Sequence, residues 1–149
     1  MMHISQYMNP KLVAQLDASL RDDALAQLVD IVNAEGKLDN RDAFYKAIIE
    51  RERIVSTGIG MGVAIPHAKL PGFDQFFIAI GILQKPVDWD SLDHAPVRLI
   101  FMIGGPDDKQ TEYLQILSSL TQAIKDEEKR KKILSLQNPK AMIELFMTI

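Results

Sequence analysis

The sequence predicts an α/β fold in which a small mixed sheet of about five strands lies between helices on both faces. Near-continuous apolar runs at 76–83 and 97–103 are the first observation, because such runs are typical of strands that are covered on both faces. The second is the order of the segments, since two segments with helical periodicity precede the strands and three follow them. A chain of 149 residues fits one domain with a single core, which we expect to span residues 1–149.

The first helix is expected to begin at Ser19, because Asp22 three residues later completes an approximate capping box, and to stop before Gly36. Its apolar face recurs at helical spacing and consists of Leu25, Leu28, Val29 and Val32.

A second helix is expected from residue 39 or 40 to about residue 51, with Phe44 and Ile48 facing inward. Arg51 continues this stripe seven residues after Phe44. A charge on an apolar stripe is unusual unless it has a partner, which makes Arg51 a candidate site residue.

The remaining elements follow from local patterns. A short apolar strand is expected at 63–65, and a short edge strand with a turn-rich loop between the two long runs, around 87–89. Asp107 with Gln110 resembles a capping box, a fourth helix is expected at Asp126, and Asn138-Pro139 is expected to start the last helix. The third helix presents the stripe Tyr113, Ile116, Leu117, Leu120 and Ile124, and the last faces inward through Met142, Leu145, Phe146 and Ile149.

Composition excludes several classes of function. The formal net charge is −3 and the pI is near 5.6, which argues against a broad nucleic-acid footprint. The sequence has no cysteine, so disulfides, thiolate nucleophiles and zinc–sulfur sites are excluded. Three scattered histidines without metal-ligand spacing predict no metal site, and no bound cofactor is expected. No signal peptide and no apolar run long enough to span a bilayer are recognised, so we expect a cytoplasmic protein without direct membrane insertion.

Gly58, Gly60 and Gly62 form a glycine-rich segment that leads into a strand, and this context does not fit a nucleotide site. A dinucleotide fingerprint needs G-x-G-x-x-G opening a helix, and a P-loop needs a glycine-lysine pair that is absent in that context. Glycines do allow backbone amides to approach an anion closely, so Gly58, Gly60 and the Thr57 hydroxyl are candidates for an anion pocket.

His67 follows Pro66 at the end of this segment, and a neutral imidazole is a good nucleophile near pH 7. A phosphorylated imidazole can pass its group on, and phosphoryl transfer mainly requires positioning and fixed positive charge. Arg51, Lys69, the Thr57 hydroxyl and the loop amides are the candidates to supply it.

These residues resemble the EIIA domain of the fructose/mannitol class of the phosphoenolpyruvate-dependent phosphotransferase system. The resemblance is carried by three strings, which cover Arg51-Glu52, Ser56-Thr57-Gly58-Ile59-Gly60 and Ala64-Ile65-Pro66-His67-x-Lys69. It continues through Asp90-x-x-Asp93-x-x-Pro96-Val97 and the closing helices, so it extends over nearly the whole chain. A free-standing domain of this length most resembles the EIIA-Ntr (nitrogen regulatory) branch, whose members are usually regulatory.

The resemblance implies a protein-histidine phosphotransferase with a five-stranded mixed sheet. It implies that His67 accepts a phosphoryl group from an HPr-like phosphocarrier protein, and that the domain either acts as a regulatory EIIA or passes the group to an EIIB partner in sugar transport. It also implies that Arg51 assists at the phosphoryl group. The family commonly has a second histidine where this sequence has Tyr113. Tyrosine can donate one hydrogen bond to a phosphoryl oxygen but is not a cation at pH 7.

Simpler interpretations stay open for each residue. Without its motif His67 would more often be a structural histidine, Arg51 could simply close a helix C-terminus, and Tyr113 could simply fill the core. The alternative function is a regulatory binding module that senses phosphorylation state, acts on a target protein and passes phosphate nowhere.

Overall fold

The computed structural model describes residues 3–147. Within them, the strands are β1 (Val13–Leu16), β2 (Gly58–Gly60), β3 (Val63–Ala64), β4 (His67–Lys69), β5 (Phe77–Val87) and β6 (Val97–Gly105). The helices are η1 (Ile4–Tyr7), η2 (Pro10–Leu12), α1 (Arg21–Ala34), α2 (Arg41–Ile54), α3 (Gln110–Ile124), α4 (Glu127–Ser135) and α5 (Pro139–Glu144), where η marks a 3-10 helix. The expected inward position of Ile149 lies outside the described residues.

The strands form one mixed sheet in the order β1-β5-β6-β3-β2. The long central pair β5–β6 is antiparallel, β1 joins β5 in parallel, and β3 joins β6 in parallel. The short strand β4 also pairs with β6 in parallel, further along the same edge than β3. The predicted α/β fold with a small mixed sheet is therefore confirmed, with six strands among the described residues because two short strands share one edge of β6.

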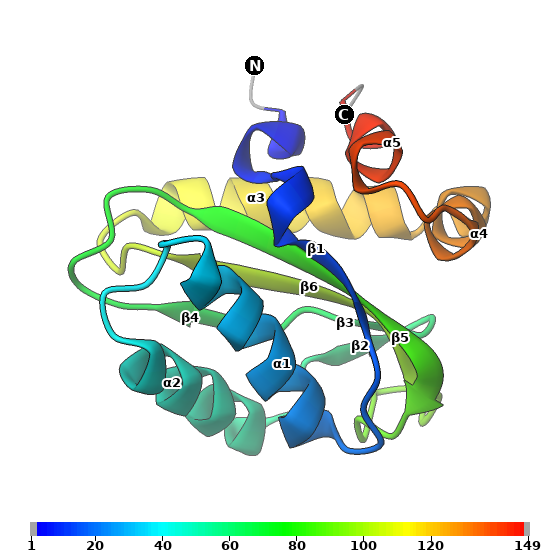
Figure 1. The fold of residues 1–149 in the computed structure, drawn as a ribbon, viewed down its shortest axis with the longest axis horizontal. Coiled ribbons are helices and arrows are strands. Elements are labelled where there is room, and N and C mark those ends of the chain that lie inside the picture. The colour runs from blue at the N-terminus through cyan, green and yellow to red at the C-terminus, as the bar shows by residue number, and fades with distance from the viewer. Residues whose placement is uncertain (1–2, 148–149) are drawn as a thin grey trace.

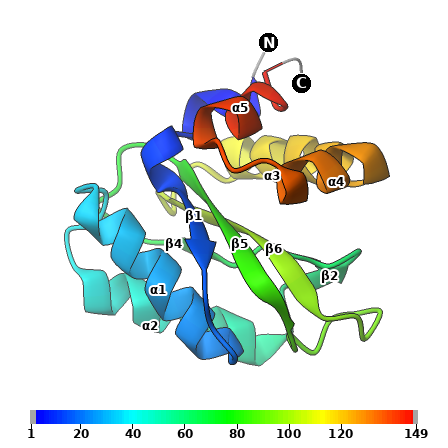
Figure 2. The same ribbon diagram turned by 45° about the vertical axis from the view of Figure 1, so that its right-hand side comes forward.

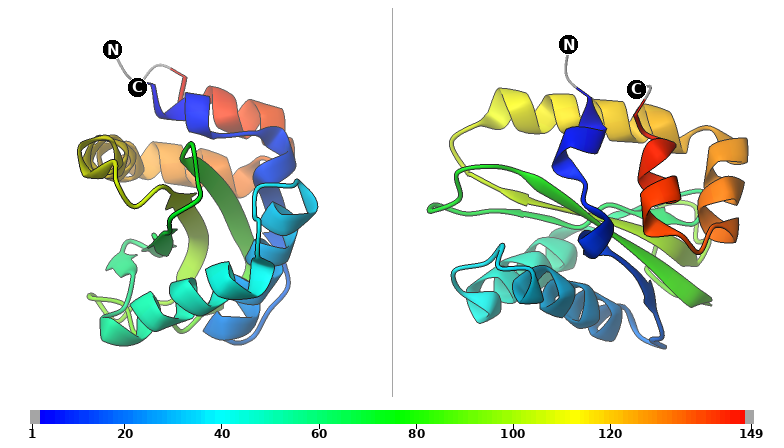
Figure 3. Two further views of the ribbon diagram at one scale, coloured as in Figure 1. Left: turned by 90° about the vertical axis from the view of Figure 1, so that its left-hand side faces the viewer. Right: turned by 45° about the horizontal axis from the view of Figure 1, so that its top comes forward.

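Helices cover both faces of this sheet (Figure 1), as predicted. Helices α1 and α2 lie against one face, while α3, α4, α5 and the N-terminal 3-10 turns lie against the other; Figures 2 and 3 show the same two layers from other sides. Side chains of a strand alternate between faces, so β5 sends Ile78, Ile80 and Ile82 towards α3–α5 and Phe77 and Ala79 towards α1 and α2. Both faces being covered explains why the central strands read as continuous apolar runs.

Three of the predicted helix starts are confirmed. Asn40 caps α2 by accepting from Ala43 N at 3.0 Å, Asp126 caps α4, and Asn138 caps α5 with Pro139 in its first turn. The other two helices, α1 and α3, begin later in the chain than predicted. Helix α1 begins at Arg21 rather than at Ser19, because Leu20 keeps the extended backbone that leads out of β1. Helix α3 begins after Lys109 rather than at Asp107.

The predicted edge strand at 87–89 was wrong. Val87 is the last residue of β5 and pairs with Val97, across an irregularity in the ladder that follows Ile82. Trp89 lies in the loop beyond and is 1 % exposed.

Strand β1 was not predicted, since four residues carry too little pattern and pair only with a distant partner, the segment 80–83 of β5.

None of the helices in residues 3–147 has both the length and the apolar character needed to cross a bilayer.

Gly104 allows α2 and β5 to approach β6 closely, which generates a stability prediction. A methyl group at Gly104 would overlap the Phe77 ring and lie 2.9 Å from Phe44 Cε1. We expect Gly104→Ala to lower the free energy of unfolding by about 1–3 kcal/mol, since overpacked cores must shift. Chemical denaturation of Gly104→Ala, Phe77→Leu and the double variant measures this, and the double variant should lose less than the sum of the single losses. Strict additivity would contradict the predicted contact.

Candidate functional site

His67 is the first residue of β4, at the point where the chain moves along β6 from one short partner strand to the next. Hydrogen bonds to β6 fix its backbone, since Ile103 N donates to Pro66 O at 3.0 Å and His67 is in register with Ile103. The imidazole is partly buried. The parallel pairing of β4 with β6 thus holds the ring at a defined place at the edge of β6.

The hydrogen bonding of His67 selects one tautomer. Its Nδ1 lies 3.2 Å from the carbonyl oxygen of Ile65. A carbonyl only accepts, so Nδ1 carries the proton and Nε2 keeps a free lone pair. Burial lowers the pKa of His67 and outweighs the opposing effect of the Ile65 carbonyl, and the positive charges of Arg51 and Lys69 lower it further. The imidazole is therefore neutral at pH 7, with the lone pair of Nε2 available.

Tyr113 lies beside His67, with its ring centroid 5.5 Å from that of the imidazole. It is 5 % exposed, so it belongs to the apolar stripe of α3 and to the site at once. Burial raises the pKa of its phenol, an effect that the charge of Arg51 partly offsets. At pH 7 Tyr113 is a neutral neighbour of the ring and can donate a single hydrogen bond.

Arg51 contacts the C-terminal end of its own helix and also lies near His67 and Tyr113. Its Nη1 donates to the carbonyl oxygen of Val55 at 2.9 Å, which closes the C-terminal turn of α2. Its charge is near enough to lower the pKa of both His67 and Tyr113. The structure therefore brings together three of the predicted site residues, His67, Arg51 and Tyr113.

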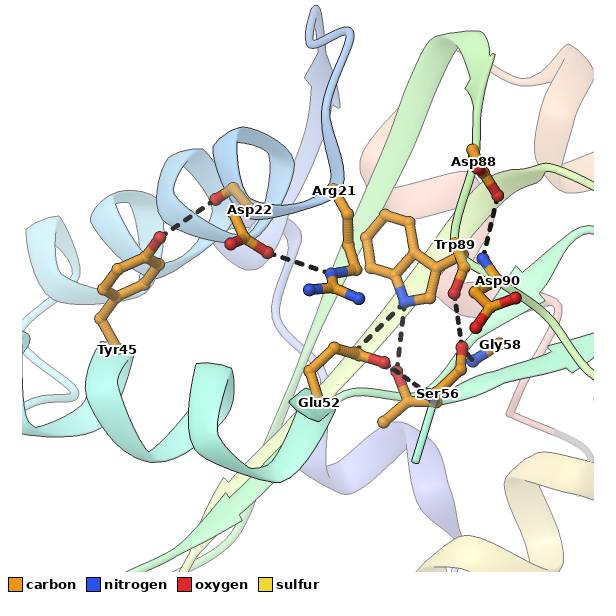
Figure 4. Close-up of polar contacts among 10 residues, drawn as sticks. Arg21, Asp22, Tyr45, Glu52, Ser56, Gly58, Asp88, Trp89 and Asp90 are labelled. Carbon is orange, nitrogen blue, oxygen red and sulfur yellow. Dashed lines mark hydrogen bonds and ion pairs between the residues drawn. The ribbon is translucent and has the colours of Figure 1, made fainter. Parts of the chain in front are cut away.

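Glu52 is a buried residue near the site for which the sequence analysis assigned no role. Its carboxylate is 2 % exposed and accepts from Thr57 N at 2.6 Å, from the Thr57 hydroxyl at 2.6 Å and from Trp89 Nε1 at 3.2 Å. Figure 4 shows Glu52 on α2 facing Trp89, with Ser56 alongside. The signal was present in the sequence, because Glu52 lies four residues after Ile48 on the inward stripe of α2.

Thr57 differs from the prediction. Its hydroxyl donates its proton to Glu52 and accepts weakly from Trp89 Nε1 at 3.3 Å. The side chain is 5 % exposed, so this hydroxyl has no proton left for a phosphoryl oxygen. Thr57 instead ties the segment after α2 to the loop that holds Trp89.

The glycine segment forms a tight hairpin between β2 and β3 rather than an open cradle. Gly60, Met61 and Gly62 all have positive φ angles, of 101°, 62° and 76°. Two backbone amides of this segment already donate hydrogen bonds to side chains of the protein: Gly58 N donates to Ser56 Oγ and Met61 N donates to Asp93. The glycines are needed for close packing, because a methyl group at Gly58 would overlap Ser91. The amides of Gly58 and Met61 therefore already have acceptors within the protein, while the predicted part of Gly60 in an anion pocket stays a prediction.

The loop facing this hairpin is fastened to it by Asp93. The carboxylate accepts from Met61 N at 3.1 Å and from Ala95 N at 3.0 Å, and these backbone donors lower the pKa of Asp93. Gly60 leaves room for that carboxylate, since a methyl group there would lie 3.1 Å from its Oδ2. Among the described residues, no group of three or more histidine, aspartate or glutamate side chains could hold a metal ion.

Residues 6–148 match the family model for "Phosphoenolpyruvate-dependent sugar phosphotransferase system, EIIA 2". The chain is 32 % identical over 129 residues to the fructose-specific EIIA component of Haloferax volcanii, covering 87 % of this chain and 84 % of that protein. It is 35 % identical over 130 residues to the fructose-specific EIIABC component of Bacillus subtilis, covering 87 % of this chain but only 20 % of that longer protein. A nitrogen regulatory protein of Pseudomonas aeruginosa is 27 % identical over 150 residues and is covered to 97 %.

Solved structures have the same fold. The nitrogen regulatory protein IIA-Ntr from Neisseria meningitidis superposes with a TM-score of 0.89 at 24 % identity, covering 96 % of this chain and 98 % of that one. The mannitol IIA of Escherichia coli superposes with a TM-score of 0.77 at 18 % identity, covering 93 % of this chain and 97 % of that one.

The buried carboxylate of Glu52 generates a second prediction. Glu52→Ala leaves the Thr57 amide and the Thr57 hydroxyl without their acceptor, and each unpaired buried donor costs about 1–3 kcal/mol. We expect a loss of about 3 kcal/mol in the free energy of unfolding, measured by chemical denaturation. Glu50→Ala on the exposed side of the same helix is the matched control and should stay within about 0.5 kcal/mol. Equal losses in the two variants would contradict the structural role of Glu52.

The burial of His67 and the charges near it predict how its imidazole titrates. Its imidazole should titrate below the ordinary histidine value of about 6.5 in an NMR titration, with Nδ1 as the protonated nitrogen. Arg51→Gln removes a nearby positive charge, so the imidazolium form becomes more favourable and the pKa of His67 should rise. Arg53→Gln, an exposed arginine two residues along α2, is the control and should leave the pKa unchanged. A pKa of His67 that falls in Arg51→Gln would refute this arrangement.

Proposed function

The chain belongs to the EIIA 2 family of the phosphoenolpyruvate-dependent sugar phosphotransferase system, and we propose that it carries a phosphoryl group on Nε2 of His67. The observation that carries this proposal is the Ile65 carbonyl, which holds the proton on Nδ1 and leaves the lone pair of Nε2 free at neutral pH. Family membership supports a role in phosphotransfer. The tautomer of His67 supports Nε2 as the nitrogen that carries the phosphoryl group.

The proposed step is a displacement at phosphorus. The lone pair of His67 Nε2 forms the new N–P bond while the N–P bond of a phosphorylated histidine on the donor protein breaks, and its electron pair returns to the donor's nitrogen. The Nδ1 proton of His67 stays in its hydrogen bond to Ile65. Transfer of this kind depends on positioning and charge more than on covalent help from the protein, and Arg51 supplies positive charge.

The donor that we propose is an HPr-like phosphocarrier protein, and the chain would act as a protein-histidine phosphotransferase in the cytoplasm. The onward acceptor would be an EIIB component, because relatives named as fructose-specific EIIA and EIIABC components are similar over 87 % of this chain.

A second function rests on a different observation. The nitrogen regulatory protein of Pseudomonas aeruginosa matches 100 % of this chain over 97 % of its own length. The alternative is therefore a regulatory module that binds a target protein according to the phosphorylation state of His67 and passes the group to no EIIB.

The test incubates a phosphorylated HPr-type donor with three forms of this chain: wild type, His94→Ala and His67→Ala. Wild type and His94→Ala, a control at a surface-loop histidine, should gain an acid-labile, base-stable phosphate, and His67→Ala should gain none. Equal labelling of His67→Ala would overturn the assignment of the acceptor. Arg51→Ala should slow labelling by about a hundredfold, because loss of one transition-state donor has that order of effect, whereas Arg53→Ala should not.

The two functions separate in a further pair of assays. Rapid transfer from labelled wild type to a sugar-specific EIIB would support the transport role. Target proteins captured differently by wild type and His67→Glu, with no transfer to EIIB, would support the regulatory role.

A further inference from the structure

Lys69 lies on the same face of β4 as His67. Residues two apart on a strand face the same side, so His67 and Lys69 project together while Ala68 between them is buried on the other side. The Lys69 ammonium lies 4.1 Å from the centroid of the Tyr113 ring, the ring that also flanks His67. Lys69 therefore lies over the ring that also flanks the imidazole.

A second contact fixes the end of this side chain. Lys69 Nζ donates to Gln110 Oε1 at 2.6 Å, and Gln110 is the first residue of α3. No carboxylate within residues 3–147 forms an ion pair with Lys69. Both of its partners, the phenol ring and the amide, are uncharged at pH 7. The positive charge of Lys69 is thus held in place without being neutralised.

A phosphoryl group on His67 needs such a charge. It carries about −1.5 to −2 charges near pH 7 and has three acceptor oxygens. Arg51 supplies one positive charge, and one of its N–H groups is already used by the Val55 carbonyl. Tyr113 and Gln110 supply none. Lys69 is then the second cation within reach, and its ammonium has three donors of which Gln110 takes one.

We propose that Lys69 binds the phosphoryl group carried by His67, and that the Tyr113 ring and Gln110 are positioning residues that hold the ammonium ready beside it. The proposal rests on the proposed function. Lys69 would leave the ring or the amide for the phosphoryl oxygens once the anion is present, since an ion pair with a dianion is stronger than either contact with a neutral partner. The flexible stem of lysine allows this movement.

The sharpest test avoids a protein donor. Phosphoramidate, a small N–P compound, would label His67 without any protein docking surface, alongside a phosphorylated HPr-type donor in a parallel assay. Lys69→Met should slow labelling by both donors by about tenfold or more, and Lys69→Arg should restore most of the rate. Lys85→Met removes an exposed charge from the other end of β5 and is the matched control, which should label as wild type does.

A second readout follows the phosphorylated protein. In a phosphorus NMR titration, the phosphoryl group on Lys69→Met should have a higher pKa than on wild type, because a neighbouring cation favours the dianion. Gln110→Ala should give a smaller change in the same direction. Tyr113→Leu removes the ring on which the ammonium rests and should resemble Gln110→Ala. A merely structural role for Lys69 would not move the pKa of the phosphoryl group.

The outcomes are distinguishable. If wild type is labelled on His67 and Lys69→Met is labelled as fast by phosphoramidate with an unchanged phosphoryl pKa, Lys69 is not a phosphoryl ligand. Slowing with the protein donor alone would assign Lys69 to donor docking and would also overturn the proposal. Absence of any label on His67 in the wild type with either donor would instead be a failure of the proposed function itself.

Discussion

The buried carboxylate of Glu52 is the interaction on which the arrangement around the site depends. Burying a carboxylate is costly unless its oxygens are satisfied, and here the surrounding groups are all donors, from Thr57 and Trp89. Those donors come from two segments that are far apart in the chain. One carboxylate on α2 therefore joins the start of the glycine hairpin to the loop after β5.

The contacts of Glu52 also constrain Arg51, the residue before it in α2. Arg51 precedes Glu52 in the chain, so the anchor that fixes Glu52 in the core also fixes where Arg51 leaves the helix. The carbonyl of Thr57 in turn accepts from Ile65 N at 3.0 Å, and Ile65 supplies the carbonyl that sets the tautomer of His67. A short chain of hydrogen bonds thus runs from the buried carboxylate through Thr57 and Ile65 to the imidazole of His67.

The edge of β6 provides the other constraint. Strands β3 and β4 pair in succession along the same edge, and Ile65 and Pro66 connect them without leaving it. His67 is therefore held at the rim of a sheet whose interior is packed on both faces, where a rigid support and access from solvent coexist. The ring of Tyr113, which belongs to the core stripe of α3, lies beside the imidazole. Burial of the imidazole lowers its pKa.

Features that depend on local pattern were predictable from the amino-acid sequence. The apolar runs of β5 and β6, the caps Asn40, Asp126 and Asn138, and the Pro66-His67 motif with its family are all readable because periodicity, capping and motifs involve residues close in the chain. The structure alone decided what distant segments do to each other. It paired β1 with β5, gave the Thr57 hydroxyl to Glu52 instead of to an anion, and set Lys69 over the ring of Tyr113. Such contacts depend on how the layers pack, and no spacing along the chain records them.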